Sequence, residues 1–131
     1  MKFAKTLTCT LLIMAFILSI QPLFGTADAA TMNTYTSYSY AGLSINSDNQ
    51  ATVSGSVYAS DSSYSVSGRL YLLQYKNGSW TIYKSWAQVT DTGSLAVSHT
   101  CTVVSGYKYK TKFVTNVNGE NVTKYSAEKE I

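Results

Sequence analysis

Two neighbouring side chains could together perform nucleophilic chemistry. His99 and Cys101 are two residues apart, so in a regular strand they point to the same face, as a Cys-His nucleophile pair requires. That chemistry also needs an orienting acid, and the neighbouring Ser98, Thr100 and Thr102 provide none. Because cysteine is among the most often buried residues, we expect Cys101 to lie in a core. An intermolecular disulfide at Cys101 is the alternative, and no catalytic residue is assigned.

The acidic residues after the first thirty positions are scattered singly. They form neither an oxygen-rich cluster nor the spacing of a calcium loop, so no metal and no cofactor are expected. A glycosidase pair assembled from two distant carboxylates stays open as an alternative. These acids are Asp48, Asp61, Asp91, Glu120, Glu128 and Glu130.

Three lysines alternate with residues suited to a core. Lys108, Lys110 and Lys112 would share one face of a strand whose other face carries Tyr109 and Phe113. This row could contact an anionic surface such as a wall polymer. Alternatively, it is a solvated outward face that discourages aggregation between sheets. We expect no nucleic-acid partner, because the net charge beyond residue 29 is only about +2 and forms no extended basic stripe.

Aromatic residues are the second candidate for binding. Trp80, Tyr83 and Trp86 on one expected strand, with Tyr71 and Tyr75 on its neighbour, cannot all enter a core. Exposed rings could stack on sugars or anchor a protein partner. Tyrosine is also simply a good strand former. Regular alternation would place Trp80 and Trp86 on one face and Tyr83 on the other, unless a bulge intervenes.

The elements that must position these side chains are strands. Tyr, Thr, Val and Ser alternate at high density, and no window shows helical periodicity. Asn77-Gly78 and Asn118-Gly119 predict two tight hairpin turns of type I′, because both residues readily adopt positive φ. The resulting prediction is an all-β, seven-stranded antiparallel sandwich of two sheets. Its expected strands are 35–45, 51–59, 69–76, 80–89, 95–104, 107–117 and 121–129.

Several short motifs carry a resemblance. They are Gly78-Ser79-Trp80, Lys84-Ser85-Trp86, Gly106-Tyr107-x-Tyr109 and Val117-Asn118-Gly119-Glu120. With the strand spacing, they resemble immunoglobulin-like and fibronectin type III-like sandwiches, and more closely small secreted domains common in Gram-positive bacteria, most of them without an assigned activity. The resemblance implies a fold rather than a function, since sandwiches host many unrelated sites.

The first 29 residues are expected to be a cleaved signal peptide. A basic start precedes the apolar run Leu7 to Ile20, and Ala27-Asp28-Ala29 fits a small-x-small cleavage site. The run is about fourteen residues, whereas a stable membrane span needs roughly 20, so no stable membrane insertion is expected. Residues 30–131 would then be one secreted, extracellular domain.

Together these features predict a secreted, non-catalytic binding module for a protein or a cell-surface glycan. The expected binding residues are Trp80, Tyr83 and Trp86 with the three lysines. A small cationic secreted toxin or antibacterial protein is the alternative, and a small hydrolase is a weaker one. Few charges and the absence of proline after Pro22 leave strand edges poorly protected against pairing with another chain. Self-association through an edge strand is therefore a further alternative.

Overall fold

Alternating apolar and polar residues build nine strands in the computed structural model, which describes residues 33–131. The expected signal peptide lies outside the described residues. The all-β, two-sheet sandwich is confirmed. The strands are β1 (Thr36–Ile45), β2 (Gln50–Ala59), β3 (Ser65–Lys76), β4 (Ser79–Ser85), β5 (Val89–Thr92), β6 (Ser94–Thr102), β7 (Lys108–Val117), β8 (Glu120–Tyr125) and β9 (Lys129–Glu130).

The strand count differs from the expected seven because two predicted strands are each interrupted. Residues 80–89 contain β4 and the beginning of β5, which pair with different halves of β3. Residues 121–129 likewise become β8 and the start of β9, both pairing with β7. Each edge of this sheet is therefore a broken strand, which shortens the continuous edge open to another chain.

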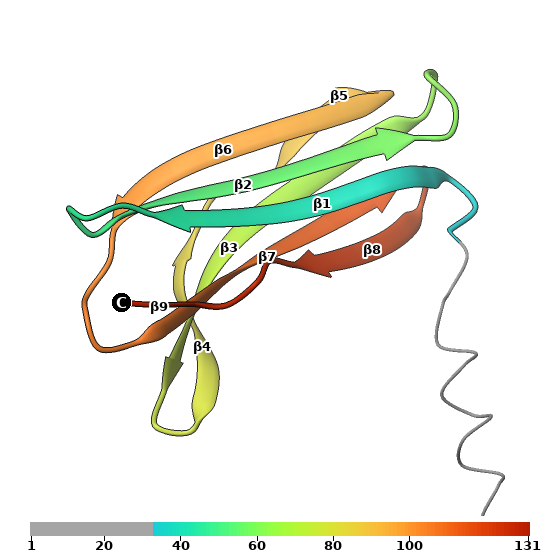
Figure 1. The fold of residues 1–131 in the computed structure, drawn as a ribbon. Helices are drawn as coiled ribbons and strands as arrows, with labels where there is room; N and C mark the ends of the chain where they lie inside the picture. Colours follow the sequence, from blue (N-terminus) through green and yellow to red (C-terminus); the bar gives the residue numbers. More distant parts are fainter. Residues whose placement is uncertain (1–32) are drawn as a thin grey trace, which may run out of the picture. The chain divides into compact units, whose positions relative to one another are not determined.

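The strands form two antiparallel sheets. β1, β2 and β6 make a three-stranded sheet in the order β1-β2-β6. The six-stranded sheet has the order β4-β3-β7-β8, with β5 also on β3 and β9 also on β7. Figure 1 shows the three-stranded sheet above the other, and the β3–β4 hairpin extending past the sandwich at the bottom of the view.

The two Asn-Gly turns behave as predicted. The φ angles are 53° at Asn77, 81° at Gly78, 48° at Asn118 and 88° at Gly119, all in the left-handed region that a type I′ turn needs. These turns fix the β3–β4 and β7–β8 hairpins and hence the registers of both strand pairs.

Phe113 holds the two sheets together. Its ring is fully buried between Gly55 of β2 and Gly68 of β3. A Cβ added at Gly55 would approach the ring to 2.6 Å, and one at Gly68 to 2.7 Å. Both positions must therefore be glycine for a phenyl ring to fit between the sheets, and the ring fills the space that the two missing side chains leave.

Tyr109 closes the corner between β6 and β7. Its ring is fully buried, and its hydroxyl donates to the carbonyl of Val104 at 2.9 Å while accepting from the N–H of Val104 at 3.0 Å. Gln74 Nε2 donates to the same hydroxyl at 2.9 Å. The buried Tyr109 hydroxyl therefore has hydrogen-bond partners on β3 and on the segment between β6 and β7. These partners make its burial tolerable.

Glu120 joins the beginning of β1 to β8. Its carboxylate accepts hydrogen bonds from the backbone N–H groups of Thr34 at 2.9 Å and of Tyr35 and Thr36 at 3.2 Å. Partial desolvation opposes ionisation, but these hydrogen bonds outweigh it and lower the pKa of the Glu120 carboxyl. One ionised side chain therefore ties the two sheets together at this end.

Candidate functional site

The lysine row lies on the outward face of the six-stranded sheet. Along β7, Tyr109, Thr111 and Phe113 are fully buried, whereas Lys108 is exposed and Lys110 is half-buried. The alternation predicted for this strand is therefore confirmed. The positive charges project away from the core, as a contact surface requires.

Trp80 and Lys110 meet on that face, although they come from strands separated by β3. The Lys110 Nζ lies 4.3 Å from the centre of the Trp80 ring and 4.8 Å from the centre of the Tyr125 ring. Tyr75, opposite Trp80 across the hairpin, packs against it at 5.3 Å between centroids. An ammonium close to two rings is stabilised by both π systems, so the two rings favour this position of the Lys110 ammonium.

A shallow depression of about 250 Å³ opens beside these rings, lined by Tyr75, Trp80, Lys108 and Glu128. Tyr75 is 39 % exposed and Tyr125 is 52 % exposed, so aromatic surface remains accessible around the Lys110 ammonium. We name the outward side chains Tyr75, Trp80, Lys108, Lys110 and Tyr125 the basic-aromatic face. It combines stacking surface with positive charge, and Lys112, 5.7 Å from the Tyr71 ring, extends it along β7.

A bulge in β4 lies between Trp80 and Trp86, at Tyr83. The register of β3 with β4 shifts between Leu72 and Leu73, so Tyr83 has no partner residue and Lys84 lies opposite the buried Leu72. Tyr83 turns inward, where its hydroxyl donates to the carbonyl of Thr102 at 3.1 Å. Tyr83 therefore lies on the opposite face from Trp80, as regular alternation predicted, and the bulge breaks the alternation only beyond Tyr83.

Trp86 also faces the other sheet rather than sharing an outward face with Trp80. Its ring stacks on His99 of β6, with 5.0 Å between centroids and 5° between planes, and packs against the core. The three predicted aromatic residues therefore lie on two different faces of the six-stranded sheet. Trp80 belongs to the outward surface, and Tyr83 and Trp86 connect β4 to β6.

Cys101 lies in the core, 9 % exposed, as the analysis of its residue type favoured. Burial raises the pKa of its thiol, and the nearby Lys84 ammonium only partly offsets this, so the reactive thiolate is disfavoured. A disulfide to another chain would require β6 to move. The ring of His99 stacks on Trp86.

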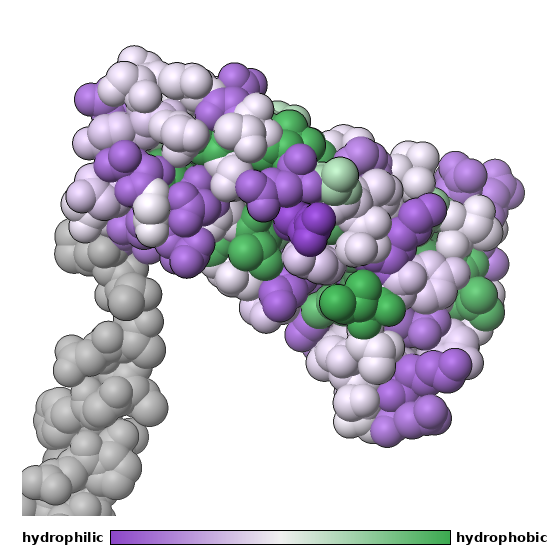
Figure 2. Space-filling model, turned by 180° about the vertical axis from the view of Figure 1, so that it is seen from behind, coloured by the Kyte–Doolittle hydropathy of each residue, from purple (hydrophilic) through white to green (hydrophobic). Residues whose placement is uncertain are grey.

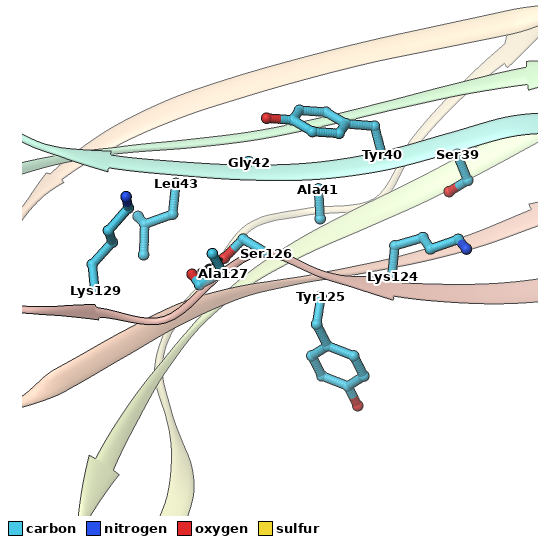
Figure 3. Close-up of a pocket in the computed structure, with 10 residues that line it drawn as sticks. All are labelled: Ser39, Tyr40, Ala41, Gly42, Leu43, Lys124, Tyr125, Ser126, Ala127 and Lys129. Atoms are coloured by element: carbon cyan, nitrogen blue, oxygen red, sulfur yellow. Dashed lines mark hydrogen bonds between the residues drawn. The ribbon is translucent and has the colours of Figure 1, made fainter.

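A groove of about 400 Å³ lies between the edge of β1 and the break between β8 and β9. Ala41, Leu43 and Ala127 make its apolar part, and Figure 3 shows Lys124 and Lys129 at opposite ends of it. The hydroxyl oxygen of Ser39 in its wall is buried without a hydrogen-bond partner. No pattern in the sequence indicated this groove, because it depends on how two sheet edges diverge.

Among residues 33–131, no three His, Cys, Asp or Glu side chains group in a way that could hold a metal ion. No helix of the described part of the chain is long and apolar enough to cross a membrane. Figure 2 shows hydrophobic residues as small separate patches among hydrophilic ones on the face seen from behind.

Comparison with known proteins identifies no family. No protein-family model matches the sequence, and no curated protein matches it closely enough to count as a relative. Among solved structures, the chain is similar to the sporulation control protein Spo0M of Bacillus subtilis, with a TM-score of 0.32 and 12 % sequence identity. The match covers 71 % of this chain and 48 % of that one, so the chain spans about half of that protein's length. At this level of similarity the comparison bears on neither family nor function.

Proposed function

We propose that the protein is a secreted, non-catalytic module that binds an anionic cell-surface polymer through its basic-aromatic face. The observation that carries this proposal is the Lys110 ammonium held between the Trp80 and Tyr125 rings on an outward sheet face. Lys108 and Lys112 extend the positive charge along the same strand. Anionic groups of the polymer would pair with the lysines while its sugar rings stack on the free aromatic surface.

A non-catalytic role is supported by what surrounds the two nucleophile candidates. The Cys101 thiol is buried with a raised pKa, and His99 is stacked under Trp86. A nucleophile needs an activating base and access to substrate, and neither residue has both.

Kinship with immunoglobulin-like and fibronectin type III-like domains is part of the same proposal. The orders β1-β2-β6 and β3-β7-β8 correspond to strands A-B-E facing C-F-G in such sandwiches. The hydroxyl of Tyr109, which bonds to Val104 five residues upstream, resembles the tyrosine corner of those domains. Domains of this architecture commonly serve in recognition at cell surfaces, which agrees with secretion.

The test is binding of the purified protein to isolated Gram-positive cell walls before and after chemical removal of their anionic polymers. We expect saturable binding to intact walls and loss of binding to stripped walls. Lys110→Gln should weaken binding about ten-fold, because it removes the central cation of the face. Lys124→Gln is the matched control, since it removes the same charge from the groove beside β1. Equal binding by both variants, or undiminished binding to stripped walls, would contradict the proposal.

A further inference from the structure

Charged residues are distributed unequally between the two sheets. Every Lys and Arg in residues 33–131 lies on a strand of the six-stranded sheet: Arg69, Lys76, Lys84, Lys108, Lys110, Lys112, Lys124 and Lys129. The strands β1, β2 and β6 contain no Lys, Arg, Asp or Glu. The outward face of the three-stranded sheet therefore carries no formal charge from its own strands, although it is open to solvent.

Hydroxyl groups cover most of this uncharged face. Antiparallel pairing aligns its outward side chains in rows across the three strands, because directly opposed residues share a face. The rows are Tyr38-Tyr58-Ser94, Tyr40-Ser56-Ala96, Gly42-Ser54-Ser98 and Ser44-Thr52-Thr100. We name these residues the hydroxyl face. With strands about 4.8 Å apart, the hydroxyls form a regular grid of donors and acceptors.

Three tyrosines give the hydroxyl face its aromatic surface. Tyr38, Tyr40 and Tyr58 are 52 %, 50 % and 52 % exposed, and the Tyr38 and Tyr58 rings lie 5.9 Å apart between centroids. Three half-exposed rings on one face expose more aromatic surface than a single surface tyrosine would.

The Tyr40 ring packs over Gly42. A Cβ added at Gly42 would lie 2.9 Å from both Cε1 and the hydroxyl of Tyr40, so the ring extends over the glycine. Figure 3 shows the Tyr40 ring reaching along β1 toward Gly42. A ring lying along the sheet presents one π face outward, which is the orientation that stacking on a sugar ring requires.

We infer that the hydroxyl face is a second binding surface, which takes an uncharged polysaccharide. Its sugar rings would stack on Tyr40 and on the Tyr38-Tyr58 pair, and its hydroxyls would exchange hydrogen bonds with the Ser and Thr grid. The absence of charge selects this ligand class. An anionic polymer would find no cation there, and a protein partner with ordinary surface charges would lose their hydration without gaining an opposite charge.

The experiment measures depletion of the purified protein from solution by three insoluble neutral polysaccharides: cellulose, chitin and starch granules. The variant carries Tyr40→Ala and Tyr58→Ala together. Tyr125→Ala is the matched control, because Tyr125 is equally exposed but belongs to the basic-aromatic face. We expect the wild type and the control to bind at least one polysaccharide, and the double variant to bind it about ten-fold more weakly.

Unchanged binding by the double variant, with a Tm near that of the wild type, would overturn the inference, as would failure of the wild type to bind any of the three polysaccharides. Gel filtration adds a further outcome. A concentration-dependent dimer that the double variant loses would assign the hydroxyl face to a second copy of the chain instead. Gly42→Ala tests the positions of the side chains separately: it keeps all three tyrosines, but the added methyl group would displace the Tyr40 ring and the Ser54 hydroxyl, so binding should fall while the aromatic content is unchanged.

Discussion

The two sheets share one core but have opposite outward surfaces. On the six-stranded sheet, Lys110 lies between Trp80 and Tyr125, and three outward positions of β7 are lysines. On the three-stranded sheet, the outward positions hold mostly Ser, Thr and Tyr and carry no charge. Inward positions do not differ in this way, since both sheets contribute apolar residues to one buried cluster. Folding constrains the inward residues, whereas the outward ones are free to carry function.

This contrast separates stability from recognition. Phe113 packs on Gly55 of one sheet and Gly68 of the other, so it supports both outward faces equally while touching neither. Trp80 and Tyr40 differ from Phe113, because each of them is part of a single outward face. Substitutions in the core should therefore affect both faces together, and outward substitutions should affect one face alone.

The largest expected effect is that of Phe113→Ala. Removing a fully buried ring should lower the free energy of unfolding by about 3–5 kcal/mol, because a cavity opens between the sheets. As the temperature rises and the Phe113→Ala variant unfolds, its binding to cell walls and its binding to a neutral polysaccharide should be lost together. Thermal unfolding followed by circular dichroism gives the stability. Tyr125→Ala should stay within about 0.5 kcal/mol of the wild type. If Phe113→Ala abolished one binding activity and left the other intact, the shared support of the two faces would be refuted.

An intermediate effect is expected from salt, which distinguishes the faces without mutation. Raising NaCl from about 0.05 M to 0.5 M shortens the Debye length to a few Å and should weaken binding to intact walls about ten-fold. Binding to a neutral polysaccharide should change little, because the hydroxyl face has no charge to screen. The same protein measured on both ligands provides its own control. Equal salt dependence on the two ligands would mean that one face binds both.

Much of this arrangement could be predicted from the sequence, and the reasons are local. The Asn77-Gly78 and Asn118-Gly119 turns require positive φ, which few other pairs adopt so readily, and both form as predicted. The alternation along residues 108–113 correctly separated three lysines from the core, because a strand has a fixed period of two.

Features that depend on distant partners were not predictable. The bulge at Tyr83 places Lys84 opposite Leu72 and turns Trp86 toward His99, and nothing in the residues of β4 marks it. The start of β3 at Ser65 was missed because Gly68 weakens a strand signal, yet the Phe113 ring requires a glycine there. The meeting of Trp80 with Lys110 likewise depends on the register across three strands.

The smallest expected effect concerns Glu120, which ties β8 to the start of β1. Because its pKa is lowered in the folded protein, its stabilising contribution is present above the unfolded value of about 4.3 and is lost as the pH falls through the lower folded value. Glu120→Gln should therefore lower the Tm slightly at pH 7, and this difference from the wild type should shrink as the pH falls and the wild-type carboxylate takes up a proton.

Thermal melts from about pH 2 to pH 7 measure this difference, with Glu128→Gln as the control for removal of one negative charge elsewhere. The tie holds the beginning of β1, the strand that carries Tyr38 and Tyr40, and it lies apart from the Lys110 cluster. Glu120→Gln should consequently weaken neutral-polysaccharide binding more than wall binding. A decrease in Tm of the same size at every pH would show instead that the Glu120 side chain acts through packing. Hydrogen bonds to an ionised carboxylate must weaken when the carboxylate is protonated.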